Sequence, residues 1–97
     1  MRTTTRENWR FTFSVSVVGQ LLGKSPVTLR QWDEKGIVSF GRVPGSLDRQ
    51  TTTDGVRRIA GAARNHGRIS ASRYHLVCAT MTLLEEIEGS NNRKVKR

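Results

Sequence analysis

The most informative segment is GKSPVTLRQWDEKGI, which occupies residues 23–37. Its Ser25-Pro26 pair is a typical helix start, because the serine hydroxyl caps free backbone N–H groups and proline has no N–H to satisfy. We therefore predict a helix that begins at the proline and runs to about Glu34. Leu29 and Trp32 lie three positions apart in it, so both belong to the face that packs on a core.

A second short helix is predicted directly before this one. Ser16 is a suitable N-cap, and the apolar residues that follow are Val17, Val18, Leu21 and Leu22. Only residues 23–25 separate the two helices, a spacing typical of a helix-turn-helix. Gly23 and Gly36 are expected to end the first and second helix in left-handed conformations. A short extended segment is predicted upstream, where the residues that alternate with polar ones are Phe11, Phe13 and Val15.

A β-hairpin and a third helix are predicted after it. The segment 41–46 is rich in turn residues, and it separates an expected strand at Ile37, Val38 and Phe40 from a returning strand over 47–50. A hairpin at this place in the chain is in the position of a wing. Thr52 is expected to cap the third helix, which runs to about His66 and stops at Gly67. The inner stripe of that helix is Val56, Ile59, Ala60 and Ala63.

A fourth helix is predicted from Ser70 or Ser72 to Glu88, with Gly89 as its stop. One ridge of it carries Val77, Met81, Leu84 and Glu88, and beside that ridge lie Leu76, Leu83 and Ile87. This apolar surface is too wide for one narrow stripe, so we expect the helix to join two copies of the chain or to pack back on the domain. The predicted organisation is a flexible basic arm (1–12), a winged helix-turn-helix domain (13–67), a C-terminal packing or dimerisation helix (68–89) and a basic disordered tail (90–97).

The charge of the chain favours a polyanionic partner. Its 97 residues include 17 Lys+Arg and 8 Asp+Glu, for a net charge of +9. A field of that size on one small domain is typical of nucleic-acid binding. No apolar run approaches the roughly 20 residues that span a bilayer, so no membrane partner is expected. One cysteine, Cys78, cannot form an internal disulfide, which favours a cytoplasmic location.

Catalysis and metal binding find no support in the sequence. His66 and His75 have no Cys, Asp or Glu at ligand spacing, so no metal site is expected. Cys78 lies in a mostly apolar helix, where it is expected to be a small buried side chain. No phosphate-binding loop or nucleophile–base pair is present. We therefore expect a protein that is not an enzyme and needs no cofactor.

The segment from Phe13 to Ile59 resembles the DNA-binding domain of MerR-type winged helix-turn-helix proteins. The resemblance rests on the run from Gly23 to Ile37, which matches the family pattern Gly-Val-Ser-Pro-x-Thr-Leu-Arg-x-Tyr/Trp-Glu/Asp-x-x-Gly-Leu at most positions. The expected wing departs from the family, since it is about two residues longer and lacks the usual aromatic residues. The C-terminal part is also expected to lack the long dimerisation helix, with its Cys or effector-binding domain, of the metal- and drug-sensing members. The chain is therefore more similar to the small effectorless members, such as phage excisionases and the DNA-binding parts of bacterial or phage transposition and packaging proteins.

The expected fold is thus mainly α, a MerR-like winged helix-turn-helix with a short β-hairpin wing and a C-terminal helix. The second helix would enter the major groove, where its N-terminal residues meet base edges. The expected contacts of this recognition helix come from Ser25, Val27, Thr28, Arg30, Gln31 and Lys35. Arg42 and Arg49 of the wing are expected to contact phosphates or the minor groove. Arg57 and Arg58 either contact phosphates or merely solvate the third helix.

Three functions are compatible with these features. The first is a sequence-specific double-stranded DNA-binding protein that regulates transcription, working with RNA polymerase in the bacterial nucleoid or in a phage-infected cell. The second is an architectural factor, excisionase-like or terminase-like, that bends DNA for a recombinase or for packaging. The third is a basic RNA-binding protein, which the low aromatic content of 6% disfavours because RNA modules stack bases on aromatic side chains. Binding as a homodimer or as copies side by side on DNA is expected in the first two.

Overall fold

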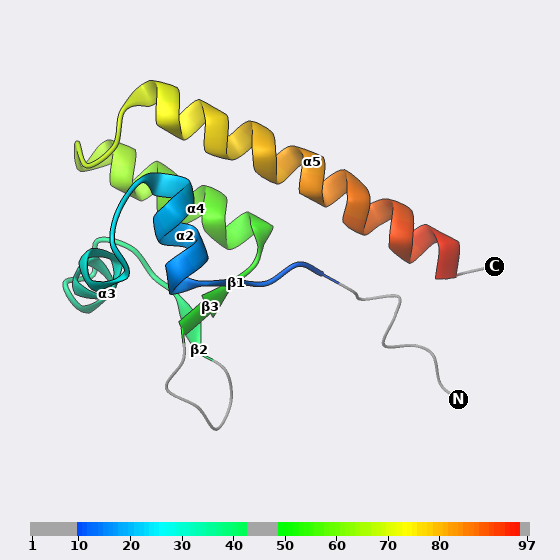
Figure 1. The fold of residues 1–97 in the computed structure, drawn as a ribbon, viewed down its shortest axis with the longest axis horizontal. Helices are drawn as coiled ribbons and strands as arrows, with labels where there is room; N and C mark the ends of the chain where they lie inside the picture. Colours follow the sequence, from blue (N-terminus) through cyan, green and yellow to red (C-terminus); the bar gives the residue numbers. More distant parts are fainter. Residues whose placement is uncertain (1–9, 43–48, 96–97) are drawn as a thin grey trace.

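The computed structural model describes residues 10–42 and 49–95, with the backbone alone at 42 and 92–95. This part of the chain is mainly helical, with a small antiparallel sheet (Figure 1). The elements follow the order β1 (Phe13–Ser14), α2 (Val15–Leu22), α3 (Pro26–Glu34), β2 (Gly41–Arg42), β3 (Arg49–Thr51), α4 (Thr53–Asn65) and α5 (Ala71–Val95). In Figure 1, α5 lies alongside α4, and the β2–β3 hairpin lies on the opposite side of the molecule.

The first helix begins earlier than the sequence predicted. Ser14, and not Ser16, is its N-cap, and the Ser14 hydroxyl accepts a hydrogen bond from the N–H of Val17 at 3.3 Å. The expected strand position of Val15 is therefore wrong. The physical reason is burial, because a helical turn places Val15 and Val18 on the same inward face, where both are buried.

The connection between α2 and α3 is as predicted. Gly23 has φ 73°, a left-handed conformation that glycine adopts without steric cost. Ser25 caps α3, since its Oγ accepts from the N–H of Thr28 at 3.1 Å. Gly19 allows the turn to fold back closely, because a Cβ at that position would lie 2.5 Å from the carbonyl oxygen of Lys24. Gly36, with φ 81°, follows the end of α3 as expected.

The predicted strand at 37–40 is wrong. This segment is irregular, and Val38 and Phe40 turn inward to become part of the core. The N–H groups of Ile37 and Val38 instead donate to the carbonyl of Trp32, at 2.9 and 3.4 Å, which closes the end of α3. Because these N–H groups bond to Trp32, pairing with β3 begins only at Gly41. The predicted strand positions 47 and 48 lie outside the described residues.

The sheet has the order β1-β3-β2, with β3 in the centre. Both pairings are antiparallel, and the aligned residues include Phe13 with Thr51 and Gly41 with Gln50. The β2–β3 pair confirms a hairpin after α3 at its described end. The pairing of β1 on the other edge of β3 was not predicted, because the short upstream strand carries no sequence signal for its partner.

Helix α4 forms the centre of the core. Its N-cap is Thr52, as predicted, and the predicted inner stripe of Val56, Ile59, Ala60 and Ala63 is fully buried. The stripe packs against α5, where Val77 and Met81 are also fully buried and Leu84 is partly buried against the same core. Cys78 is half-buried, and therefore more accessible than expected.

Helix α5 does not stop at Gly89, and the prediction that residues 90–95 are disordered is also wrong. The helix continues to Val95. A glycine inside a helix costs only about 1 kcal/mol relative to alanine. That cost is offset by an anchor next to it, because the carboxylate of Glu88 is buried and accepts a hydrogen bond from the N–H of Phe11 at 2.7 Å. In the described ranges, no helix combines the length and apolar character that crossing a bilayer requires.

Candidate nucleic-acid interface

The candidate interface is centred on the outward face of α3. Leu29 and Trp32 are buried on the inner face of this helix, as predicted. The side chains on the opposite face are exposed, and they are Val27 (59% exposed), Arg30 and Gln31. A helix with this division presents an apolar group, a guanidinium and a carboxamide together to solvent. Those groups match the thymine methyl, guanine and adenine edges of the major groove.

The start of α3 is ordered by its own hydroxyl groups. Ser25 Oγ lies 3.0 Å from Thr28 Oγ1 in addition to accepting the N–H of Thr28. These hydroxyls are therefore engaged in shaping the first turn, where sequence reasoning expected them to contact DNA. Lys35, at the other end of the helix, is exposed as expected for a residue that reaches a phosphate.

The structure places Arg49 differently from the expected wing contact. Its Nε donates to Asp33 Oδ2 at 2.7 Å, and its Nη2 lies 3.7 Å from Glu34 Oε2. The Arg49 side chain is only 15% exposed and that of Asp33 only 11%. Arg49 thus faces the end of α3. The side chain of Arg42 and the hairpin tip at 43–48, on which the wing contacts were also expected, lie outside the described residues.

Arg57 and Arg58 have different environments. Arg57 bridges α4 and α5, since it pairs with Glu85 and its Nη2 donates to Thr82 Oγ1 at 2.8 Å. The hydrogen bond between Arg57 and Glu85 holds the pKa of Glu85 below its ordinary value and raises the pKa of Arg57. Arg57 is therefore an inter-helix contact, which neither sequence alternative anticipated. Arg58 pairs with Asp54 one turn earlier, at 2.7 Å, and is 74% exposed.

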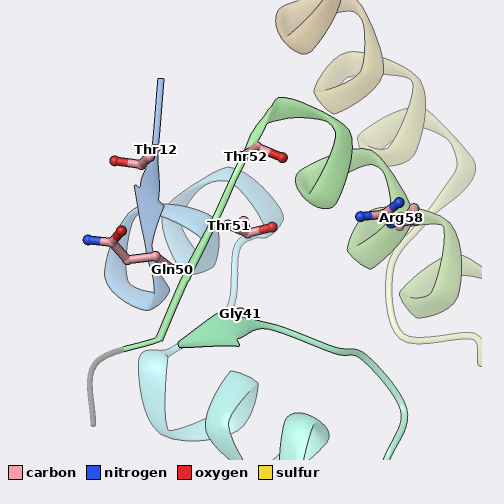
Figure 2. A pocket seen from close by; sticks show the side chains of 6 residues that line it. All are labelled: Thr12, Gly41, Gln50, Thr51, Thr52 and Arg58. Atoms are coloured by element: carbon pink, nitrogen blue, oxygen red, sulfur yellow. The ribbon is translucent and has the colours of Figure 1, made fainter. Parts of the chain in front are cut away.

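Arg58 lines a shallow pocket between the sheet and α4 (Figure 2). The other lining residues are Thr12, Gly41, Gln50, Thr51 and Thr52. In the view of Figure 2, the hydroxyl groups of Thr51 and Thr52 turn toward the side on which Arg58 lies. An exposed guanidinium near hydroxyl donors is suited to a phosphate oxygen. Because Arg58 is largely exposed, its guanidinium remains accessible for the DNA phosphate contact that the sequence suggested.

A second basic pocket was missed by the sequence analysis. It lies beside the α2–α3 turn, and its lining includes Lys24, Arg68 and Arg73, whereas none of its lining residues is acidic. Arg73 is held there because its Nη1 donates to the carbonyl of Leu21 at 3.3 Å. These basic residues come from the α2–α3 turn, the α4–α5 connection and the first turn of α5. Their proximity depends on the packing of α5 on α2, for which the sequence contains no direct signal.

Comparison of the chain with family models, with curated proteins and with solved structures finds no match. Among the described residues, no group of three or more His, Cys, Asp or Glu side chains is placed to hold a metal ion.

Proposed function

We propose that this chain is a sequence-specific double-stranded DNA-binding protein with a winged helix-turn-helix of the MerR type, in which α3 is the recognition helix. One observation carries the proposal. After a tight turn at Gly23, α3 buries Leu29 and Trp32 and presents Val27, Arg30 and Gln31 to solvent. An exposed helix with base-reading side chains, on a chain of net charge +9, fits the major groove of a polyanionic duplex.

Contacts to the phosphates of the DNA backbone would come from both ends of α3. Lys24 and the pocket it shares with Arg68 and Arg73 adjoin the N-terminus of the helix, and Lys35 follows its C-terminus. Arg58 lies toward the sheet, and Arg42 belongs to strand β2. Each such contact releases counterions and adds affinity without sequence preference. In this proposal Arg49 and Arg57 are not phosphate contacts, because each is paired with a distant element and is only 15% or 30% exposed, whereas Arg58 is 74% exposed.

The proposed role is regulation of transcription in a bacterial nucleoid or a phage-infected cell, with RNA polymerase as the protein partner. The experiment that tests the function is selection of bound duplexes from a random-sequence library, followed by footprinting of the selected site on genomic DNA. We expect one enriched motif and a palindromic footprint in a promoter. A phased array beside an attachment site would instead support an architectural role with a recombinase. A bound pool without any enriched motif would contradict sequence-specific binding.

We further propose that a second copy of the chain covers an exposed strip of α5. The strip consists of Leu76, Leu83 and Ile87, which are 59%, 63% and 48% exposed. These residues recur at spacings of seven and four, so they share one helix face. In an antiparallel pair of α5 helices, exposed Arg73 and His75 near the start of one helix would approach exposed Glu86 of the other. A two-fold dimer would also offer two recognition helices to half-sites about 34 Å apart.

Replacement of Leu83 by glutamate is expected to convert the dimer to a monomer of unchanged fold, because Leu83 lies on the strip and outside the core. Light scattering over a concentration series measures the change, and circular dichroism checks the fold. Ala71→Glu, on an exposed position of the same helix that lies off the strip, is the matched control and should leave the dimer intact. A wild-type chain that stays monomeric at high concentration would contradict the proposed dimer.

A further inference from the structure

The ion pair between Arg49 and Asp33 joins two elements that are distant in the chain. Arg49 begins β3, the central strand of the sheet and one arm of the β2–β3 hairpin. Asp33 lies in the last turn of α3. Their hydrogen bond of 2.7 Å is charge-assisted, and both side chains are largely withdrawn from solvent. A pair in this environment has a defined geometry, because a charge-assisted hydrogen bond is short and directional and water competes little for largely buried groups.

Positive charge near the C-terminal end of α3 stabilises the two acidic side chains there. Asp33 and Glu34 place two carboxylates at a helix C-terminus, where the helix dipole disfavours negative charge. The last turn of α3 itself carries no basic residue, and the side chain of Lys35, which follows it as the C-cap, is exposed to solvent. Arg49 supplies that positive charge from the sheet, with Nε on Asp33 and Nη2 toward Glu34. Its guanidinium is therefore occupied by the protein and points to the helix.

We infer that Arg49 and Asp33 are positioning residues, which hold the β2–β3 hairpin and the recognition helix in one fixed relation so that both meet the same duplex. The inference rests on the proposed function. It assigns to Arg49 a role in specificity that acts through α3, in place of a direct phosphate contact. It also gives the acidic residue Asp33 a favourable role in DNA binding, although its negative charge by itself would repel DNA.

The substitution Asp33→Asn separates the two roles, because they predict changes of opposite sign. If charge alone mattered, loss of a carboxylate near DNA would strengthen binding to every duplex. Positioning predicts instead that binding to the selected duplex weakens, so that the preference for it over a random duplex falls about ten-fold, a size typical of residues in contact. Glu34→Gln is the matched control, since Glu34 is 69% exposed and 3.7 Å from Arg49. It should leave that preference unchanged.

A double-mutant cycle and a salt titration complete the test. Arg49→Ala should lower the preference as much as Asp33→Ala, and the double variant should lose no more than either one, because both remove the same link. The dependence of affinity on salt should stay that of the wild type. A slope reduced by about one unit in Arg49→Ala, with tighter binding in Asp33→Asn, would show that Arg49 is a phosphate contact and overturn the inference.

Asp33→Glu keeps the inference testable if the other variants fail to fold, a failure that circular dichroism would detect. It keeps the net charge and the carboxylate but lengthens the side chain by one methylene. Positioning predicts a reduced preference in this folded variant, whereas a preference equal to that of the wild type would contradict positioning. A wild-type chain that binds all duplexes equally would contradict the proposed function itself, and the inference with it.

Discussion

Arg30→Ala is expected to weaken binding to the selected duplex by about 1–3 kcal/mol while changing binding to a random duplex much less. The reason is that Arg30 shares the exposed face of α3 with Val27 and Gln31, whereas Leu29 is buried. A guanidinium there can form two parallel hydrogen bonds to one guanine, and that arrangement discriminates between bases. Titration of fluorescent duplexes at fixed salt measures both affinities.

Arg30→Lys is the matched control for charge. Lysine keeps the positive charge but has no planar pair of donors, so this variant should retain the affinity for random duplexes and lose most of the preference. Equal losses of affinity on the selected and random duplexes in Arg30→Ala would reduce the residue to a phosphate contact. That result would contradict base reading by α3 at this position.

Trp32→Ala is expected to destabilise the fold by about 3–5 kcal/mol, the usual cost of removing a large buried aromatic side chain. Trp32 is 6% exposed, and it belongs to the core cluster that also contains Leu29 and Phe40. Its carbonyl also accepts the N–H of Ile37. A small domain has only about 5–15 kcal/mol of stability in total, so the variant should lose a large fraction of its free energy of unfolding. Urea unfolding followed by circular dichroism measures the loss.

Trp32→Phe separates a core role from stacking on DNA. Phenylalanine refills most of the space, so this variant should be much more stable than Trp32→Ala and should bind the selected duplex as tightly as the wild type. A stable Trp32→Ala variant that fails to bind DNA would show that the indole contacts DNA instead of the core.

The parts of the fold that the sequence predicted well are those defined by local chemistry. Ser25 and Thr52 cap their helices because a side-chain hydroxyl accepts a backbone N–H three residues later. The stripe of α4 is buried because helical periodicity places its residues on one face. The errors occurred where tertiary contacts overrode local signals. Val38 and Phe40 were drawn into the core from an irregular segment, and α5 continued past Gly89.

The candidate site divides in the same way. The outward face of α3, with Arg30 and Gln31, follows from the sequence alone, because the buried positions of a short capped helix determine which residues remain outside. The partners of Arg49 and Arg57 do not follow from it. Arg49 meets Asp33 and Arg57 meets Glu85 across separations of 16 and 28 residues. An ion pair depends on distance in space. Only the tertiary structure, which brings β3 to the end of α3 and α5 to α4, decided that these two arginines are held between distant elements of the protein.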